Sequence, residues 1–318
     1  IKVVDISVPA NAAVIREIST GLNSFFLSTE GNLLYSTHLI NDYEGSDIIS
    51  VFDISDPTNA HLLESWTLEK KAFFISSSLN FLFLSDDADY LRIYDRNSYS
   101  LIKNIYSSRG ADTITSDSRY LYTINNDKLR IIDCNDVSSP SIVSEMKTSD
   151  NSNDRGSRLI VESNLLYVLN RYPSDKSLLF VDITDRSNPQ IVNKIGPVGS
   201  YHFRDMFLEN STLYITAEDT SASRNRIYIV NVSDVENPVL VNDFDAGYNY
   251  IYNWGDDLIH ISKDGNYLYC KNGSITTYNA LSGNCMASLG RPSLATNLAV
   301  QGRYMYASYS WNGVYLYD

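Results

Sequence analysis

The chain has 318 residues, with 25 basic and 38 acidic side chains and a formal net charge of −13. An acidic chain lacks the basic face that neutralises phosphates, so we exclude a nucleic-acid partner. No apolar run reaches the roughly 18 residues that a membrane helix needs, and no basic-then-apolar signal segment opens the chain. We therefore expect no membrane span, and the length allows two ordinary domains or one large β domain.

Along the chain, a four-residue pattern recurs seven times, with apolar residues at its centre and an aromatic residue at its end. The spacing between copies runs from 37 to 55 residues, which is the length of four short strands with turns and the period of propeller blades. The copies are Asn32–Tyr35, Asn80–Phe83, Arg119–Tyr122, Asn164–Tyr167, Ser211–Tyr214, Asn266–Tyr269 and Arg303–Tyr306.

Each copy lies between two other apolar segments. An apolar residue five positions before every copy predicts a first strand, so the aromatic copy is the second strand. A third strand follows and ends in Asp or Asn. The third strands are Ile48–Asp53, Leu91–Asp95, Leu129–Asp133, Leu178–Asp182, Ile227–Asn231, Ile275–Asn279 and Val314–Asp318.

Turns such as Asp53–Pro57 and Asp182–Pro189 come next, where Asp, Ser and Asn side chains can bind nearby backbone amides and reverse the chain. A fourth, outer strand follows, as in Gln190–Ile195 and Val239–Phe244. The sequence thus predicts an all-β fold: a seven-bladed β-propeller of four-stranded antiparallel blades. We expect one domain over 1–318, with repeats anchored near residues 32, 80, 119, 164, 211, 266 and 303.

The third strand, its turn and the fourth strand resemble the LVIVD-repeat family of β-propellers. Leu178–Ile183 is close to the segment that names that family. Two copies depart from it, because Asp95–Tyr99 and Asn279–Gly283 lack the proline. The resemblance implies a propeller of seven or eight blades on a secreted or cell-surface protein, and hence an extracellular or cell-surface location.

One strand is surplus. Ile1–Pro9 repeats the third-strand pattern and Ala13–Ile18 the fourth, so this N-terminal pair (residues 1–20) is expected to join the last blade and close the ring. Ile1–Ile6 and Val314–Asp318 then compete for the same position beside this N-terminal fourth strand. The losing strand lies irregularly at the edge or, alternatively, completes the sheet of another copy and builds a filament. The residues of these self-assembly strands are Ile1, Val3, Val4, Ile6, Val314 and Leu316.

Aromatic residues concentrate in two connections, 247–255 and 309–313. Both connections should emerge on one rim, where exposed Tyr and Trp side chains suit a protein or glycan partner. The alternative is that the rings fill the central channel. The candidate partner-binding residues are Tyr248, Tyr250, Tyr252, Trp254, Tyr309, Trp311, Tyr172 and His202.

Catalytic patterns are weak. Of the four histidines, His38 and His61 lie in the first repeat, and His202 and His260 lie near the predicted channel mouth. No histidine recurs at one register, and no Gly-x-Ser-x-Gly motif occurs, so we propose no triad. A propeller hydrolase or lyase with a metal or His site at the channel mouth remains an alternative.

Two acidic segments offer candidate calcium ligands, Asp86, Asp89, Asp150 and Asp154, but their spacing does not match a calcium loop. We therefore favour solvated acidic loops and expect no metal and no cofactor.

The three cysteines lie apart in the sequence. Cys270 and Cys285 fall on second and fourth strands, near 10 Å apart, and Cys134 ends a third strand, so we expect free thiols that are mostly buried. The sequons at Asn210, Asn231 and Asn272 are weak signs of secretion.

We interpret the chain as a non-enzymatic extracellular or cell-surface scaffold that binds a protein or glycan through its aromatic rim. A self-assembling filament or sheath subunit, bound to copies of itself, is the first alternative, and the propeller enzyme is the second.

Overall fold

The computed structural model describes residues 1–39, 47–68, 70–78, 80–86, 90–106, 113–136, 138–150, 155–172, 177–196, 201–219, 222, 224–248, 261–272, 274–289 and 295–309. The chain divides into two compact units. Unit 1 comprises Ile1–Lys71, Ala222–Ile227 and Asn242–Asp318, and unit 2 comprises Ala72–Ser221 and Tyr228–Val241.

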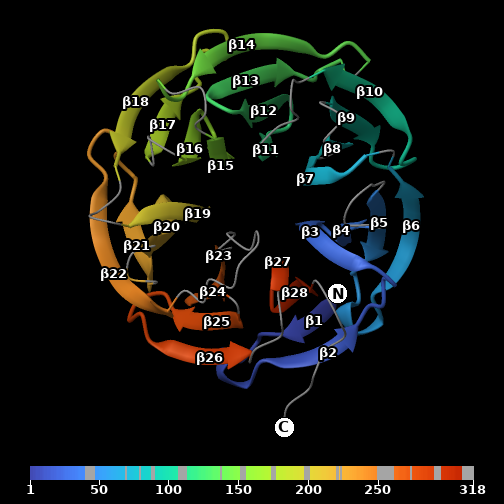
Figure 1. Cartoon of the computed structure of the whole chain (residues 1–318), viewed down its shortest axis with the longest axis vertical. Helices are drawn as coiled ribbons and strands as arrows, with labels where there is room; N and C mark the ends of the chain where they lie inside the picture. Colours follow the sequence, from blue (N-terminus) through green and yellow to red (C-terminus); the bar gives the residue numbers. More distant parts are fainter. Residues whose placement is uncertain are drawn as a thin grey trace. The chain divides into compact units, whose positions relative to one another are not determined.

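Three antiparallel sheets of four strands lie in unit 1, and Figure 1 labels their strands. The first is β3 (Asn23–Glu30), β4 (Leu33–Leu39), β5 (Asp47–Asp53) and β6 (His61–Thr67). The second is β23 (Ile261–Asp264), β24 (Tyr267–Asn272), β25 (Ser274–Asn279) and β26 (Cys285–Leu289). The third has the order β2 (Ala13–Glu17), β1 (Lys2–Asp5), β28 (Tyr304–Tyr309) and β27 (Ala295–Gln301).

Three further sheets lie in unit 2. They are β7 (Ala72–Ser78), β8 (Phe81–Asp86), β9 (Tyr90–Asp95) and β10 (Leu101–Tyr106); β11 (Thr113–Ser116), β12 (Tyr120–Asn125), β13 (Lys128–Asp133) and β14 (Ser141–Lys147); and β15 (Arg155–Glu162), β16 (Leu165–Tyr172), β17 (Leu178–Asp182) and β18 (Gln190–Ile195). The seventh sheet has residues from both units: β19 (His202–Glu209), β20 (Thr212–Asp219), β21 (Arg224–Asn231) and β22 (Val239–Tyr248).

The predicted fold class, seven blades of four antiparallel strands with strands from both chain ends in one blade, is confirmed. Within the described residues no helix is long and apolar enough to span a membrane.

The second strand of every blade is buried on both faces. Successive side chains of a strand point to opposite faces, and in each repeat both the aromatic residue and the apolar residue before it are buried. The sheets therefore pack on both sides. The buried pairs are Leu34 and Tyr35, Leu82 and Phe83, Leu121 and Tyr122, Leu166 and Tyr167, Leu213 and Tyr214, Leu268 and Tyr269, and Met305 and Tyr306.

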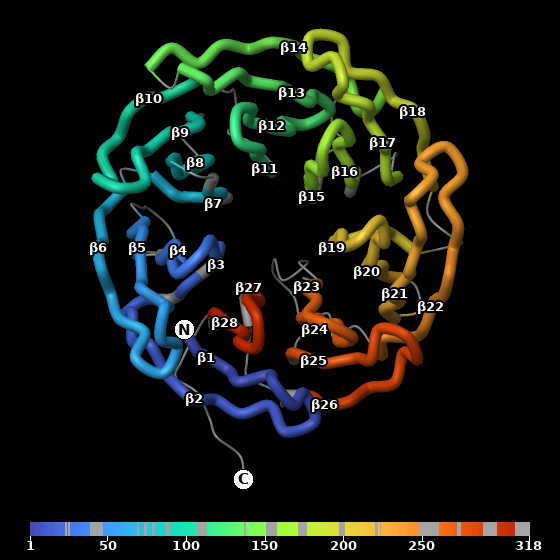
Figure 2. The backbone as a smooth tube through the Cα atoms, turned by 180° about the vertical axis from the view of Figure 1, so that it is seen from behind, coloured from blue at the N-terminus to red at the C-terminus, as the bar shows by residue number. Residues whose placement is uncertain are grey.

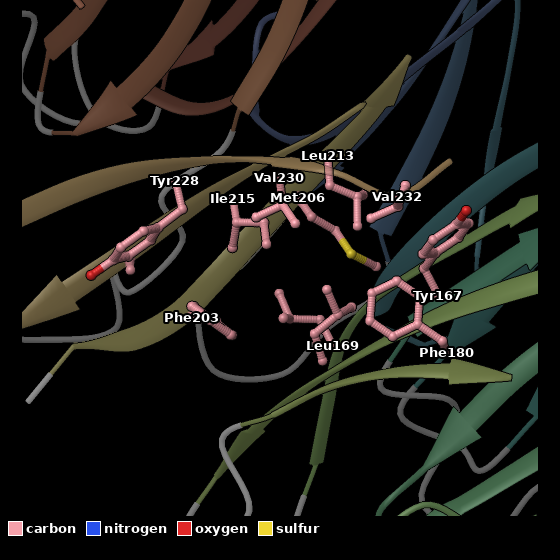
Figure 3. Packing of buried hydrophobic residues seen from close by; sticks show 12 residues of the cluster. Tyr167, Leu169, Phe180, Phe203, Met206, Leu213, Ile215, Tyr228, Val230 and Val232 are labelled. Carbon is pink, nitrogen blue, oxygen red and sulfur yellow. The ribbon is translucent and has the colours of Figure 1, made fainter. Parts of the chain in front are cut away.

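The two members of each pair belong to different hydrophobic clusters. In unit 2, Tyr167 of β16 packs with Leu213 of β20, while Leu166 packs with Tyr122 of β12. Figure 3 shows the first of these clusters, with Tyr167, Leu213, Met206 and Phe180 among its side chains. The aromatic residue of one repeat thus packs with the apolar residue of the next, which explains why the sequence repeats both.

The first and last repeats, both in unit 1, show the same packing of an aromatic residue with an apolar residue of the other repeat. Tyr306 of β28 packs with Leu34 of β4, and Val3 of β1 belongs to the same cluster. β1 pairs with β28 on one side, with Val3 opposite Tyr306, and with β2 on the other. Both views show the blue β1 beside the red β28 (Figures 1 and 2). Of the two competing strands, Ile1–Ile6 supplies β1, and Val314–Asp318 lies outside the described residues.

Asx turns follow the third strands, as predicted. The Ser55 amide donates to Asp53 Oδ1 at 2.7 Å, and the Thr58 amide donates to Asp56 Oδ1 at 3.0 Å. Hydrogen bonds from Ser55 lower the pKa of Asp53. These carboxylates order the connection that starts each outer strand.

Candidate functional site

Four of the eight predicted partner-binding residues lie outside the described residues. Tyr172 ends β16, Tyr248 ends β22 and Tyr309 ends β28. Tyr172 lies in unit 2, whereas Tyr248 and Tyr309 lie in unit 1. The joint patch therefore stays a prediction. The members that fall outside the described residues are Tyr250, Tyr252, Trp254 and Trp311.

His202 begins β19, half-buried, opposite Glu218 of β20. Glu218 forms an ion pair with Arg204, whose side chain is 9% exposed while that of Glu218 is 4% exposed. Arg204 is the extra residue of a bulge, because Phe203 and Asp205 face the successive residues Ala217 and Thr216. The bulge thus directs the guanidinium to an internal partner.

A second ion pair lies nearby along β19. Arg158 Nε of β15 lies 3.4 Å from the buried Asp205 Oδ1 of β19. The Asp205 amide donates to Thr216 Oγ1 at 3.1 Å. The charges around these strands neutralise one another within the fold, so this arrangement serves packing between β15 and β19, both of which lie in unit 2.

His38 of β4 is buried, and its Nδ1 lies 2.9 Å from Ser24 Oγ of β3. Its Nε2 is buried without a hydrogen-bond partner in the described part of the chain. Burial lowers the pKa of His38 to about 4 because the imidazolium cation loses its hydration. His61 of β6 is exposed, with Nδ1 3.2 Å from the Asn59 carbonyl, and His260 lies outside the described residues.

We predict that His38 makes folding sensitive to mild acid. Its pKa is about 6.5 when unfolded and about 4 when folded, so the stabilisation is complete above pH 6.5 and declines as the pH falls towards 4. The loss should reach about 3 kcal/mol, since each pKa unit is worth about 1.4 kcal/mol. Urea unfolding of His38→Gln should show a flatter pH dependence between pH 6.5 and 4. His61→Gln is the control, and an unchanged slope in His38→Gln would contradict the prediction.

The candidate calcium ligands are not gathered into one site among the described residues. Asp86 is fully buried, pairs with Arg92 of β9 and accepts a hydrogen bond from the Tyr90 amide at 3.1 Å. Asp150 is exposed. Asp89 and Asp154 lie outside the described residues, and within those residues no group of three or more His, Cys, Asp or Glu side chains could hold a metal.

The predicted free thiols are confirmed. Cys134 and Cys270 are buried, and Cys285 is exposed. Cys270 lies on β24 and Cys285 on β26, with β25 between them. Burial raises the pKa of the Cys134 thiol to about 12, so this cysteine is unreactive at neutral pH.

The predicted self-assembly strand β1 lies inside the chain's own sheet. Val3 and Val4 are fully buried and Ile6 is 2% exposed, so their apolar faces are already covered. Ile1 packs against the same cluster as Val3. Val314 and Leu316 lie outside the described residues.

The outer strands were predicted, but the exposure of their apolar side chains was not. Every one of the seven outer strands exposes at least one large apolar side chain, although apolar residues on predicted strands suggest burial. The sequence signal for this exposure is a pair of adjacent apolar residues. Neighbouring side chains of a strand point to opposite faces, so a strand with only one buried face cannot bury both. The exposed residues are Ile15 on β2, Leu62 and Leu63 on β6, Leu101 and Tyr106 on β10, Ile142 on β14, Ile191 and Val192 on β18, Val239, Leu240 and Val241 on β22, and Met286 on β26.

In six of these sheets the register between third and outer strand shifts by one residue. Such bulges disrupt the edge and discourage another strand from adding there. The outer strands therefore offer side chains rather than a regular backbone edge. The extra residue is apolar each time: Ile15, Leu63, Ile102, Val143, Val192 or Met286.

Residues 110–262 match a family model described as "Beta propeller domain". No curated protein matches the chain. Among solved structures, a functionally unknown protein from Desulfotomaculum acetoxidans is 11% identical with a TM-score of 0.69, covering 92% of this chain and 91% of its own. The Cps50 (Swd1) β-propeller domain of Myceliophteria thermophila is 13% identical with a TM-score of 0.65, and the match covers 92% of this chain and 98% of that domain's chain.

A proposed 6-phosphogluconolactonase from Bacteroides uniformis is 12% identical with a TM-score of 0.62, covering 83% of this chain and 82% of its own. At such identities, the likeness of each structure shows the fold alone. Together with the seven four-stranded sheets, these comparisons show that the chain has the β-propeller fold.

Proposed function

We propose that this propeller is a non-enzymatic interaction scaffold of the LVIVD type, with residues 1–318 acting as one domain at the cell surface or outside the cell. The observation that carries the proposal is the exposure of large apolar side chains on all seven outer strands. Soluble monomers seldom leave contiguous apolar surface uncovered unless it binds something. Aromatic residues around Tyr248 and Tyr309 would add a second contact region for a protein or glycan.

Burial of β1 bears on the alternative of a filament joined by strand exchange. Val3 and Val4 would have to leave their own sheet before they could complete another copy, and that exchange would expose two fully buried side chains. We therefore favour a different protein or a glycan as the partner.

Peptide and glycan arrays probed with labelled protein test the proposal. We expect the protein to bind a defined subset of the peptides or glycans on one array. Mass spectrometry of the recovered ligand should show no chemical change, because a scaffold does not alter its partner. Replacing two exposed residues by serine on one outer strand, in turn Ile191 and Val192, or Val239 and Val241, should weaken binding at least tenfold in one variant, with the melting temperature unchanged. Absence of binding on both arrays, or cleavage of the ligand, would refute the scaffold.

Surface labelling tests the location. A membrane-impermeant biotin reagent applied to intact cells should label the protein as strongly as it labels the protein in lysed cells. Labelling only after lysis would contradict a surface location.

A further inference from the structure

Five exposed large apolar side chains lie on the neighbouring outer strands β18 and β22. We call this set the outer strip and define it as Ile191, Val192, Val239, Leu240 and Val241, all of which belong to unit 2. Their exposed fractions are 44%, 38%, 60%, 51% and 62%. Such values are high for five large apolar side chains on two strands, and a partner that covered them would gain roughly 25 cal/mol for each Å² removed from water.

Hydrogen bonds link β18 to the turn that precedes β22. Asn193 Nδ2 on β18 donates to the Val235 carbonyl at 2.8 Å and to the Glu236 carbonyl at 3.0 Å. Val235 and Glu236 belong to the turn that starts β22, so this turn lies against β18. The same contact recurs one blade earlier, where Ser144 Oγ donates to the Arg186 carbonyl at 2.8 Å. The two parts of the outer strip are therefore linked through the turn that precedes β22.

The β22 part of the strip is uncovered on both faces. Successive residues of a strand point to opposite sides, and all three residues Val239–Val241 are more than half exposed. β22 is also the last strand in its sheet. A partner can thus reach this segment from either face.

Acidic side chains precede both strands of the strip in the sequence. The turns that start β18 and β22 carry four carboxylates, while the nearby cations are Arg186 and Lys194. Hydrogen bonds from their own turns lower the pKa of three of the four, so these remain ionised in mild acid. The net charge of −13 adds repulsion against a second copy. The carboxylates are Asp182, Asp185, Asp234 and Glu236.

We propose that the outer strip binds an extended polypeptide segment in which apolar residues alternate with lysine or arginine. The apolar side chains of the segment would pack on Val239–Val241 and Ile191, and its cations would face the four carboxylates. Val192 is the extra residue of a bulge in β18, so side-chain packing carries more of this contact than a regular backbone ladder. The inference rests on the proposed scaffold function and names the partner's chemistry.

A synthetic peptide of ten residues with alternating valine and lysine, acetylated, amidated and labelled with fluorescein, tests the inference by fluorescence anisotropy. We expect saturable binding that weakens at least tenfold in the double variant Leu240→Ser and Val241→Ser. The double variant Leu62→Ser and Leu63→Ser on β6 changes a matched apolar pair in unit 1 and should bind as the original chain does. Glu236→Gln should weaken binding by a smaller factor, and raising the salt from 50 to 500 mM should weaken it further because it screens the charges.

Several outcomes would overturn the inference. The first is that the valine–lysine peptide does not bind. The second is that the β6 control variant loses as much binding as the Leu240→Ser and Val241→Ser variant, and the third is that a peptide that alternates valine and glutamate binds equally well. Sedimentation showing dimers that the Leu240→Ser and Val241→Ser variant abolishes would assign the strip to a second copy instead. Melting temperatures show that each variant folds. If the peptide fails while an array ligand still binds, only the partner's chemistry is wrong; if both fail, the scaffold function is wrong as well.

Discussion

Replacing Val4 by aspartate in β1 should destabilise the protein by more than about 4 kcal/mol, which is among the largest effects of a single substitution. Val4 is fully buried and packs with Tyr269, Ile275 and Met305 in unit 1. A carboxylate there would lose its hydration without gaining a cation. Urea unfolding followed by circular dichroism measures the loss.

Val8 provides the control for this substitution. It follows β1 in the next turn and is 55% exposed, so Val8→Asp should change the unfolding free energy by less than about 0.5 kcal/mol. If Val4→Asp unfolded at the same urea concentration as the original chain, β1 would not lie between β28 and β2. Loss of assembly with retained stability would instead support strand exchange.

Truncating Leu213 or Tyr167 to alanine should cost about 3 kcal/mol each, because both side chains are buried and leave cavities. The two residues belong to one cluster, in which the aromatic residue of one repeat packs with the leucine of the next (Figure 3). The double variant should therefore depart from additivity by about 0.5–3 kcal/mol. Unfolding free energies of the two single variants and the double variant complete the cycle.

Tyr122 supplies the matched control, since it lies in a different cluster from Leu213. Tyr122→Ala combined with Leu213→Ala should be additive to within about 0.5 kcal/mol. Equal coupling in both cycles would mean that the clusters do not act separately.

The sequence predicted the blades because the repeat itself reflects packing. An aromatic residue such as Tyr167 and its neighbour Leu166 are buried on opposite faces, so each copy keeps both residues. The Asx turns could also be predicted, because an acceptor such as Asp53 and its donor Ser55 lie two residues apart.

Other features depended on contacts that no local pattern reveals. Ile1–Ile6 and Val314–Asp318 carry the same apolar alternation, so the sequence could not decide which strand pairs with β28. Asp86 suggested a cation site until its strand neighbour Arg92 proved to be its partner. Exposure of the outer strip went unpredicted because adjacent apolar residues such as Ile191 and Val192 resemble a core strand in composition.

The aromatic rim was predicted from the composition of two connections and from the strand order that places both on one rim. Tyr250 and Trp254 lie outside the described residues, and the rim remains a prediction.

The sheet that contains β1 can be completed only after β28 has been synthesised. Val3 faces Tyr306, so the ribosome must add roughly 300 residues, at about 5–20 residues per second, before β1 finds its partner strand. For about 15–60 s the apolar residues Val3, Val4 and Ile6 have no native sheet to cover both faces. A nascent chain is therefore exposed to aggregation through β1 until β28 has been added, and slower translation would lengthen the time for which this strand needs a chaperone.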